Sequence, residues 1–459
     1  MKVDPSLSPR DLSPALGRMW ELSAARILEL EGSYDPQRGS PVFTSGGRWT
    51  SRGWTEWTQG FQYGSALLQF DATGEERFLT IGRENTVRRM AAHLTHTGVH
   101  DHGFNNVSTY GNLLRLMNEG RLPEQAWERS FYELALKSSG AVQARRWTRI
   151  AGGGGFLYSF NGPHSLFVDT IRSLRSLALA HLLGHVLLEE NDTRTSLLER
   201  LLQHAAATAR YSVYYGEGRD LYDVRGRVAH ESIFNVNDGR YRCPGTQQGY
   251  SPFSTWTRGL SWAILGFAEQ LEFLDALDDW GPPTGRQEAL DGVLRALAAT
   301  CDFYLDNTAS DGLPYWDTGA PGLERLGDWR AVPADPYNAF EPVDSSAAAI
   351  ACQGLMRFGT WLGARGDPRG SRYLGAGLGL LARLLEEPYL NRAAGHQGLL
   401  LHSVYHRPAG WDRVPPGRSV PCGESSMWGD YHLREAGLLA QRLAGGGPYP
   451  VFWRGREGA

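Results

Sequence analysis

The sequence predicts an all-α protein in which twelve helices close into an (α/α)6 toroid. Apolar residues recur with helical periodicity through most of the 459 residues, and long loops rich in Gly, Pro and Asp separate the helical stretches. Strands and helices do not alternate regularly, which argues against a parallel α/β sheet. A closed ring of helical hairpins, with six helices inside and six outside, would bury every apolar stripe without leaving an open end.

The expected helices span twelve ranges: 12–31, 58–72, 82–97, 103–119, 123–139, 166–188, 193–210, 254–276, 285–307, 344–362, 368–387 and 423–443. Ser254 and the run Asp344-Ser345-Ser346 are suitable N-caps. The local strand signal predicts a small β-hairpin near 211–241. We expect residues 1–459 to form a single (α/α)6 barrel catalytic domain. Two helical domains are the alternative, and no linker-like stretch clearly supports it.

Composition excludes several classes of protein. An apolar content of 41% is ample for a large core, so disorder is excluded. The 46 Lys and Arg nearly balance the 50 Asp and Glu, and no long basic stripe appears, which argues against nucleic acid and anionic membranes as partners. The N-terminus lacks a secretory signal, and no apolar stretch is long enough to span a bilayer. The four cysteines show no CxxC spacing, so we expect reduced thiols and a cytoplasmic location.

The chemically unusual residues gather at the starts of every second expected helix. Asp101 and Asp169 stand near two of these starts, although an Asp there is most often only a cap. In alternating antiparallel helices every second N-terminus faces the same end, so we expect the active site at that end. Trp and Tyr, numbering 15 and 19, can also stack on sugar rings. The motifs are Trp54–Phe61, His100–Phe104, Phe167–Thr170, Thr246–Tyr250 with Trp256–Trp262, Asp344–Ser346 and Ser425–Asp430.

These segments resemble the unsaturated glucuronyl hydrolases, which remove a 4,5-unsaturated uronic acid from oligosaccharides made by polysaccharide lyases. The resemblance covers residues 50–435. Its most specific part is Gln-Gln-Gly-Tyr at 247–250, followed by Ser-Thr-Trp-Thr-Arg-Gly at 254–259 and then Trp262. The segments 314–317, 344–347 and 428–431 support it. The family has the (α/α)6 fold, as do the related unsaturated rhamnogalacturonyl hydrolases, which share its chemistry.

The resemblance also implies roles for individual residues. Asp169 matches the general acid and base of the family, and Asp101 matches its second essential aspartate, which holds sugar hydroxyls and tunes the first. Arg258 suits a uronate because its planar fork can donate two hydrogen bonds to a carboxylate. No cofactor and no metal ion is expected. The implied sugar-binding residues are Trp57 (with Trp54 as the alternative), Trp147, His230, Gln248, Trp256, Arg258 and Trp262.

The chemistry of an unsaturated uronide sets what the site must supply. Its C4–C5 double bond is part of a vinyl ether, so protonation at C4 creates a cationic centre at C5 that water attacks, and the hemiketal then opens. One carboxyl must begin protonated, whereas a free Asp with a pKa near ~3.9 is ionised at neutral pH. We expect the neighbouring Asp101 and the carboxylate of the substrate to raise the pKa of Asp169. Arg172 would oppose this, and we expect it to point away.

Several residues depart from the family pattern. Arg172 and Arg175 follow Asp169, where family members are usually apolar, and His102 and the pair Asn105-Asn106 follow Asp101. The resemblance therefore does not predict which sugar lies next to the uronate or whether sulfated sugars are accepted.

Two further patterns invite other functions. The glycine run 152–155 lacks the Gly-Lys-Ser/Thr ending of a phosphate loop, so we interpret it as a flexible lid or an insertion. His93, His96, His100 and His102 are close in sequence, but a further ligand set with recognisable spacing is missing. His181 and His185 lack the Glu of a zinc hydrolase and are expected to pack or lie on the surface.

The leading hypothesis is an unsaturated uronyl hydrolase whose partner is an unsaturated uronyl di- or oligosaccharide. An unsaturated rhamnogalacturonyl hydrolase, or an inverting glycosidase or epimerase on the same toroid, is the alternative enzyme. A non-catalytic sugar-binding toroid is the alternative of another class. A monomer and a homodimer both remain open, because the aromatic segment 448–453 could dock onto its own barrel or onto another subunit.

Overall fold

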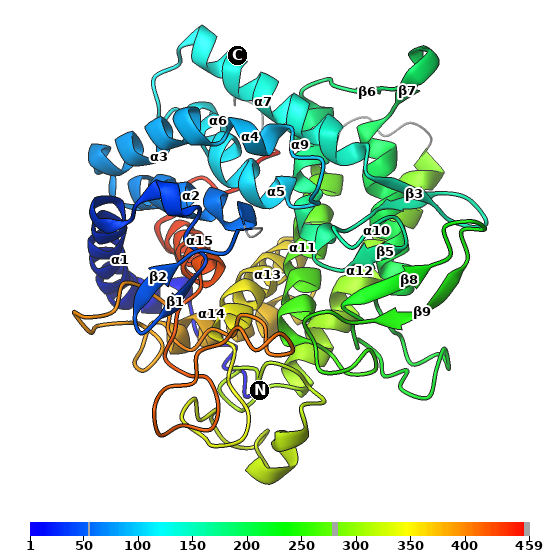
Figure 1. The fold of residues 1–459 in the computed structure, drawn as a ribbon. Coiled ribbons are helices and arrows are strands. Elements are labelled where there is room, and N and C mark those ends of the chain that lie inside the picture. Colours follow the sequence, from blue (N-terminus) through cyan, green and yellow to red (C-terminus); the bar gives the residue numbers. More distant parts are fainter. Residues whose placement is uncertain (54–55, 278–282, 454–459) are drawn as a thin grey trace.

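A computed structural model describes residues 1–53, 56–277 and 283–453, and in these ranges the helices form a closed double ring (Figure 1). Neighbouring inner helices pack against one another in chain order, and the last, α15, packs against the first, α2. The predicted toroid is therefore confirmed. The inner ring consists of α2 (Gln59–Thr73), the run α5 (His102–Asn105), η4 (Val107–Gly111) and α6 (Asn112–Asn118), the pair α8 (Thr170–Ser173) and α9 (Arg175–Leu182), α11 (Thr257–Ala276), α13 (Ser345–Gly363) and α15 (Met427–Gly445).

Each outer helix packs on the inner helix next to it in sequence. An outer helix such as α14 buries one apolar stripe, whereas α13 is buried almost continuously from Ser345 to Gly359, because it has neighbours on every side. The outer helices are α1 (Ser13–Ser33), α3 (Glu76–Arg89) with α4 (Ala91–Leu94), α7 (Ala126–Ala144), α10 (Leu197–Tyr211), α12 (Pro283–Asp306) and α14 (Arg369–Leu384).

Glycines let the inner helices approach closely beside the site. A β-carbon at Gly60 in α2 would collide with the backbone of Asn105 in α5. A β-carbon at Gly103 in α5 would likewise collide with the backbone of Ser173 in α8. The starts of three inner helices are thereby held side by side.

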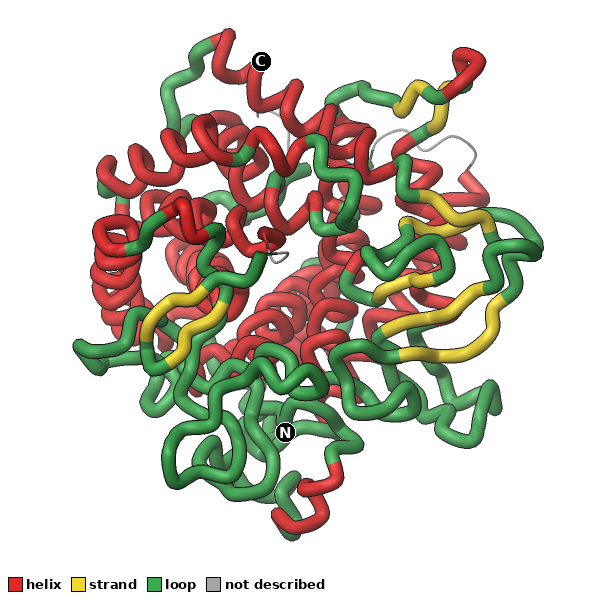
Figure 2. The backbone as a smooth tube through the Cα atoms, viewed as in Figure 1, coloured by secondary structure: helices red, strands yellow, loops and turns green. Residues whose placement is uncertain are grey.

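Short strands join the helices (Figure 2). The strands β5 (Ser165–Phe167), β8 (Glu231–Phe234) and β9 (Tyr241–Gly245) form one antiparallel sheet in the order β5-β8-β9. The other strand pairs are β1 (Phe43–Ser45) with β2 (Arg48–Thr50), β3 (Trp147–Arg149) with β4 (Gly155–Leu157), and β6 (Leu187–Leu188) with β7 (Arg194–Thr195). The 3-10 helices are η1 (Pro9–Leu12), η2 (Pro36–Arg38), η3 (Glu56–Thr58), η5 (Glu190–Asp192) and η6 (Pro321–Leu326).

Some predicted boundaries were wrong. The helix expected at 166–188 begins later, because 165–167 pair with β8 as a strand, and it ends at Leu182, before Gly184 takes a positive φ of 74°. The hairpin expected near 211–241 lies further along the chain as β8–β9, and Val213 makes only an isolated bridge with Val228. The glycine run is the turn of the β3–β4 hairpin, where positions 152–154 have positive φ, which glycine adopts without strain.

The C-terminal segment closes one end of the ring by docking onto its own barrel. Tyr449 Oη donates to Glu272 in α11 over 2.6 Å, and Arg357 in α13 donates to the Pro450 carbonyl over 3.0 Å. The Trp453 ring packs on Phe273 with centroids 5.2 Å apart. These contacts fall in the later turns of α11 and α13, so the described part of this segment covers the C-terminal ends of these inner helices. Within the described ranges, none of the helices is long and apolar enough to cross a membrane.

Candidate active site

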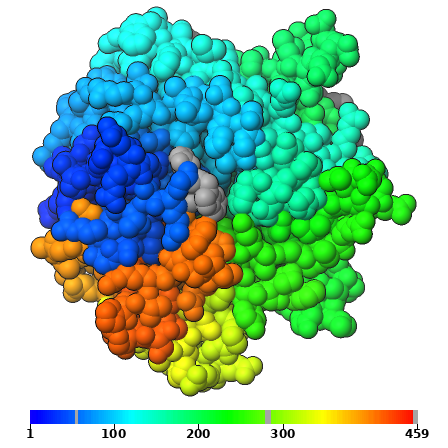
Figure 3. Space-filling view, viewed as in Figure 1, coloured from blue at the N-terminus to red at the C-terminus, as the bar shows by residue number. Residues whose placement is uncertain are grey.

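A pocket opens where the inner helices begin (Figure 3). Its walls come from the loops that precede these helices and from the first turns of α5 and α11. Phe104 and Trp262, with centroids 4.8 Å apart, and Trp57, 6.1 Å from Phe104, give it an aromatic floor. The lining residues are Trp57, Val99, His100, Asp101, Phe104, Phe160, Asp169, Gln247, Gln248, Trp256, Arg258, Trp262, Tyr405, His406 and Trp411.

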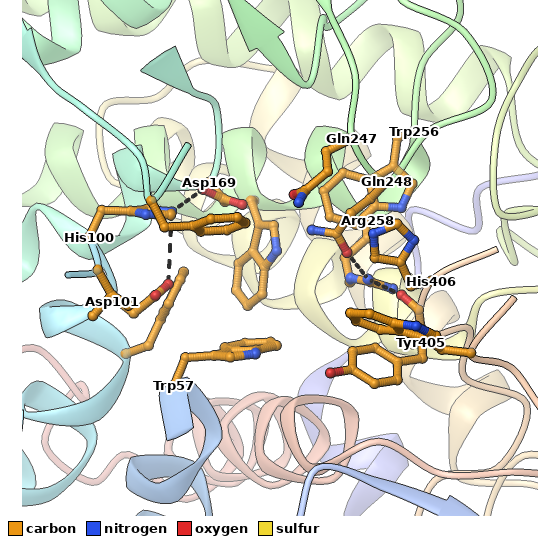
Figure 4. A pocket seen from close by; sticks show the side chains of 15 residues that line it. Trp57, His100, Asp101, Asp169, Gln247, Gln248, Trp256, Arg258, Tyr405 and His406 are labelled. Atoms are coloured by element: carbon orange, nitrogen blue, oxygen red, sulfur yellow. Dashed lines mark hydrogen bonds and ion pairs between the residues drawn. The ribbon is translucent and has the colours of Figure 1, made fainter. Parts of the chain in front are cut away.

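Two aspartates and one histidine form the polar centre of one wall (Figure 4). Asp101 directly precedes α5 and Asp169 directly precedes α8, yet neither side chain caps its helix. His100 lies between them: its Nε2 is 3.0 Å from Asp169 Oδ1 and 3.8 Å from Asp101 Oδ1. The ordinary capping role of a helix-start Asp therefore does not account for either carboxylate.

The surroundings shift the pKa values of Asp101 and Asp169 in opposite directions. Burial, joined by the charge of Asp169, raises the pKa of Asp101, against the lowering effect of His100. Burial alone would also raise the pKa of Asp169, but the hydrogen bond and charge of His100, with Arg258, lower it below its usual value. In the free pocket the expected raised pKa of Asp169 was therefore wrong, because the hydrogen bond and charge of His100 outweigh the effects that raise it. The expected contribution of the substrate carboxylate stays a prediction.

Arg258, in the first turn of α11, supplies positive charge on another side of the pocket. Its Nη1 donates to Asp344 Oδ2 over 3.1 Å and to the Val404 carbonyl, and its Nη2 donates to Gln248 Oε1 over 2.8 Å and to the Tyr405 carbonyl over 2.7 Å. These bonds occupy all four terminal N–H groups, so a bidentate contact with a uronate would need some of them to break, and that contact stays a prediction. Arg258 instead fixes the Gln248 carbonyl oxygen, which leaves the amide nitrogen of Gln248 as a donor.

His230 supports the pocket and does not line it. Its ring is buried between Phe167 and Trp256, at centroid distances of 4.5 and 4.7 Å. Its Nδ1 accepts the backbone N–H groups of Gln247 and Gln248 at 3.0 and 3.4 Å, which places the ring proton on Nε2. Burial lowers the pKa of His230 to about 4. His230 is therefore neutral near pH 7 and anchors the loop that carries the two glutamines.

Asp317, from the segment 314–317, holds the same loop from the other side. It is fully buried, and its Oδ2 accepts the backbone N–H of Tyr250 over 2.8 Å. Its Oδ1 accepts the N–H of Gly319 over 2.9 Å. Burial raises the pKa of Asp317 to about 6. The Gln-Gln-Gly-Tyr motif is thus positioned through backbone bonds from two sides.

The structure places two other tryptophans elsewhere. Trp147 does not line the pocket: after α7 the chain turns into the β3–β4 hairpin, where the guanidinium of Arg200 lies 4.0 Å from the Trp147 ring. Trp54, the alternative to Trp57, lies outside the described residues. Arg172 points away from Asp169, as expected, and pairs with Glu269 and Glu435.

Sequence reasoning assigned no role to eight of the lining residues, and two of these, Val99 and Phe104, lie within three residues of Asp101. His100 and Gln247 stand beside residues that were identified, so adjacency was a usable signal. Tyr405, His406 and Trp411 come from a long loop without a helical or strand pattern, and no signal marked them. Phe160, which stacks on His100 at 5.9 Å, belongs to the turn between β4 and β5.

The remaining histidines near Asp101 serve packing. His93 Nε2 bonds to Gln59 Oε1 over 2.7 Å, and His102 Nδ1 bonds to Ser139 Oγ over 3.0 Å. In the described part of the chain, no group of three or more His, Cys, Asp or Glu side chains is arranged so that it could hold a metal ion.

Comparisons with known proteins lead to one family. No protein-family model matches the chain. A curated unsaturated glucuronyl hydrolase of Bacillus sp. (strain GL1) is 26% identical over 405 residues, which cover 84% of this chain and 87% of that protein. Another, of Formosa agariphila, is 23% identical and covers 84% of this chain and 80% of its own. An unsaturated chondroitin disaccharide hydrolase of Streptococcus agalactiae is 22% identical over 83% of this chain and 80% of its own.

Solved structures agree on the fold. The unsaturated glucuronyl hydrolase of Bacillus sp. GL1 matches with a TM-score of 0.69 at 22% identity, over 97% of this chain and 99% of that chain. The enzyme of the same name from Streptococcus agalactiae matches with a TM-score of 0.70 at 20% identity, over 99% and 100% of the two chains. The resemblance predicted from the motifs is thereby confirmed.

Proposed function

We propose that this relative of the unsaturated glucuronyl hydrolases is itself such an enzyme, which removes a 4,5-unsaturated uronic acid from the non-reducing end of lyase-generated oligosaccharides. The observation that carries the proposal is the pocket itself: two buried carboxyl groups face an aromatic floor, and a buried Arg258 and the amide of Gln248 stand across from them. We further propose that residues 1–459 act as one catalytic domain and work in the cytoplasm, downstream of polysaccharide lyases.

In the proposed reaction Asp169 acts first as acid and then as base. Its carboxyl group gives a proton to C4 of the vinyl ether, and the electron pair of the C4–C5 bond forms the new C–H bond. The cationic centre at C5 is stabilised by the ring oxygen and attacked by water, whose proton returns to Asp169. The resulting hemiketal opens and releases the neighbouring sugar, so the glycosidic bond breaks without attack at C1. General acid and base steps of this kind typically contribute ~10²–10⁴-fold to a rate.

The other pocket residues would bind and orient the sugar. Asp101, with its raised pKa, suits a bond to a sugar hydroxyl in either direction, since a protonated carboxyl donates and an ionised one accepts. The charge of Arg258 favours a uronate in the pocket although its fork is already occupied, and the free N–H groups of Gln248 provide direct donors. Trp57, Trp256 and Trp262 offer flat apolar faces to the sugar rings.

The experiment that tests the function is ultraviolet absorbance with a panel of unsaturated uronyl disaccharides from chondroitin, heparin, gellan, xanthan and pectin digests. The conjugated double bond absorbs, and hydration destroys that absorbance. We expect loss of absorbance with at least one substrate, which would also identify the neighbouring sugar. Binding without loss of absorbance would support the sugar-binding alternative, and cleavage of saturated analogues would support an ordinary glycosidase.

A further inference from the structure

His100 is placed where it can control Asp169. Its Nε2 is within hydrogen-bond distance of Asp169 Oδ1, at 3.0 Å, and is further from Asp101 Oδ1, at 3.8 Å (Figure 4). An imidazole Nε2 carries at most one proton, so the shorter contact decides which carboxylate receives the N–H. His100 therefore acts unequally on two carboxyl groups that stand on either side of it.

The His100 side chain is held rigidly in this position. Its backbone carbonyl accepts Gln143 Nε2 from α7 over 2.8 Å and Ser173 Oγ from α8 over 2.6 Å. Its ring is 2% exposed, stacks on Phe160 and meets the edge of Phe167 with centroids 5.6 Å apart. These contacts on backbone and ring fix the direction of Nε2.

The proposed reaction leaves one requirement open, which is the source of the first proton. Asp169 must be protonated when it meets C4, yet in the free pocket its own pKa is held low. Asp101, whose pKa is raised, is not hydrogen-bonded to Asp169 in the described structure, whereas His100 is. The group in direct contact with Asp169 that can carry a proton near neutral pH is thus the imidazole of His100.

We propose that His100 is a positioning residue that orients the Asp169 carboxyl group and stores the proton that this group delivers. The proposal rests on the proposed function and deepens it. On substrate binding the His100 N–H bond breaks and an O–H bond forms on Asp169, which leaves both groups neutral. Asp169 then gives this proton to C4, takes a proton from the attacking water, and returns it to His100. The cycle therefore consumes no proton beyond those that water supplies.

The electrostatic surroundings of His100 fit a stored proton. Although burial disfavours the imidazolium, the charges of Asp101 and Asp169 raise the pKa of His100 overall, and Arg146 opposes them. Burial lowers the pKa of the other two histidines nearby, to about 3 for His204 and about 4 for His230, so neither competes for the proton. The titratable and charged groups that face His100 are Asp101, Asp169, Arg146, His204 and His230.

Two substitutions separate positioning from proton storage. His100→Phe removes the donor, and we expect kcat to fall about 100-fold with KM changed less than about threefold, the size of a general-acid contribution. His100→Gln keeps an N–H donor near Asp169 but cannot store a proton. We expect the kcat of His100→Gln to be about tenfold higher than that of His100→Phe. The alkaline limb of its pH profile should be shifted down by about one pH unit or more, because the proton is then held by a carboxyl group, whose pKa is lower than that of an imidazole. His402→Gln, at another buried histidine, should match the wild type.

A wild-type kcat in His100→Phe, or an unshifted alkaline limb in His100→Gln, would overturn the proposal. Circular dichroism identifies a variant that fails to fold, and the Gln variant remains informative if the Phe variant does so.

Nuclear magnetic resonance titration of the imidazole tests the same link without turnover. We expect the pKa of His100 to lie above the usual 6.5 in the wild type and to fall by about one unit in Asp169→Asn, because a neighbouring charge is lost. An unchanged His100 pKa in Asp169→Asn would refute the storage role. If no unsaturated substrate is turned over, the proposed function fails, and the titration still decides whether His100 and Asp169 share a proton.

Discussion

At the open end of the helical ring two buried aspartates face a single histidine, whereas at the closed end buried glutamates meet arginines. Arg172 pairs with Glu269 over 2.8 Å and with Glu435 over 2.7 Å, and Arg357 pairs with Glu272 over 2.7 Å. Removing one partner of such a pair leaves the other charge buried without a counter-charge, which destabilises the fold. The closed end therefore holds charges for structure, because each is compensated in place.

The open end leaves its charges less compensated. Asp101 and Asp169 line a pocket that solvent can enter, and their nearest cationic group is His100, whose own charge depends on pH. Arg172 is only three residues beyond Asp169, yet its side chain turns to the closed end. The start of α8 thus places the Asp169 carboxyl group in the pocket and the Arg172 guanidinium in the buried core. The direction in which each side chain points therefore decides whether its charge serves the reaction or the stability of the fold.

The largest expected effect breaks the chemistry at the open end. Asp169→Asn keeps the size of the side chain but cannot donate and accept the proton, so we expect kcat to fall at least about 1,000-fold. Substrate should still bind, because the aromatic floor and Arg258 are untouched. Steady-state rates from ultraviolet absorbance, with the exposed Asp238→Asn as control, would check this, and near-native turnover would contradict the role of Asp169.

The next effect breaks the closed end. Glu435→Gln removes one carboxylate from Arg172 and Arg175, and we expect the free energy of unfolding to fall by about 3 kcal/mol. The kcat per folded molecule should stay within about twofold of the wild type. Urea denaturation measures the loss, and the exposed Glu386→Gln is the matched control, expected to change stability by less than about 0.5 kcal/mol.

The same glutamate sets a pH dependence. Burial would raise the pKa of Glu435, but Arg172 and Arg175 lower it to about 2. Because the folded pKa lies below the unfolded value, the contribution of Glu435 to stability is present above about pH 4.5 and is lost as pH falls toward 2. Acid denaturation should therefore begin at higher pH in the wild type than in a chain without such pairs, and Glu435→Gln should flatten the dependence. Equal acid profiles for the two proteins would show that this pair is not coupled to folding.

A comparison of two tryptophans tests how far the substrate site extends from the open end. Trp57 lines the pocket and stacks on Trp428 with centroids 5.1 Å apart, whereas Trp147 lies on a hairpin outside it. Trp57→Leu should raise KM about tenfold, which corresponds to ~1.4 kcal/mol of lost stacking. Trp147→Leu should leave KM within about twofold. A rise in KM for Trp147→Leu would mean that the substrate extends over the β3–β4 hairpin.

The smallest expected effect is a gain in stability at the open end. The pKa of Asp101 is raised, mainly by burial, so its contribution to stability is fully present below about pH 3.8 and is lost as pH rises through the folded pKa. Asp101→Asn removes this dependence and should stabilise the protein at pH 7 by about 1 kcal/mol while lowering kcat. Thermal denaturation at pH 4 and pH 7 measures it. A loss of stability at pH 7 would place Asp101 among the structural charges.

The helical ring was largely predictable, because helical periodicity and helix-start residues are local signals. The site was predictable where motifs stand on those starts, as for Asp101, Asp169 and Gln248. The hydrogen bonds of Arg258 were not predictable, since two of its partners are the backbone carbonyls of Val404 and Tyr405. No side-chain pattern in the sequence marks a backbone acceptor. The lowered pKa of Asp169 depends on His100, 69 residues away in sequence, and such a contact exists only in the folded ring.

The central claim, that the reaction is hydration of a vinyl ether, is tested most directly by running it in deuterium oxide and recording the proton spectrum of the product. Protonation by the Asp169 carboxyl predicts one solvent deuterium at C4, added to one face, together with loss of the vinyl proton signal. A product that is released with its vinyl proton intact and without deuterium at C4 would contradict the account, because water would then have attacked C1 as in an ordinary glycosidase.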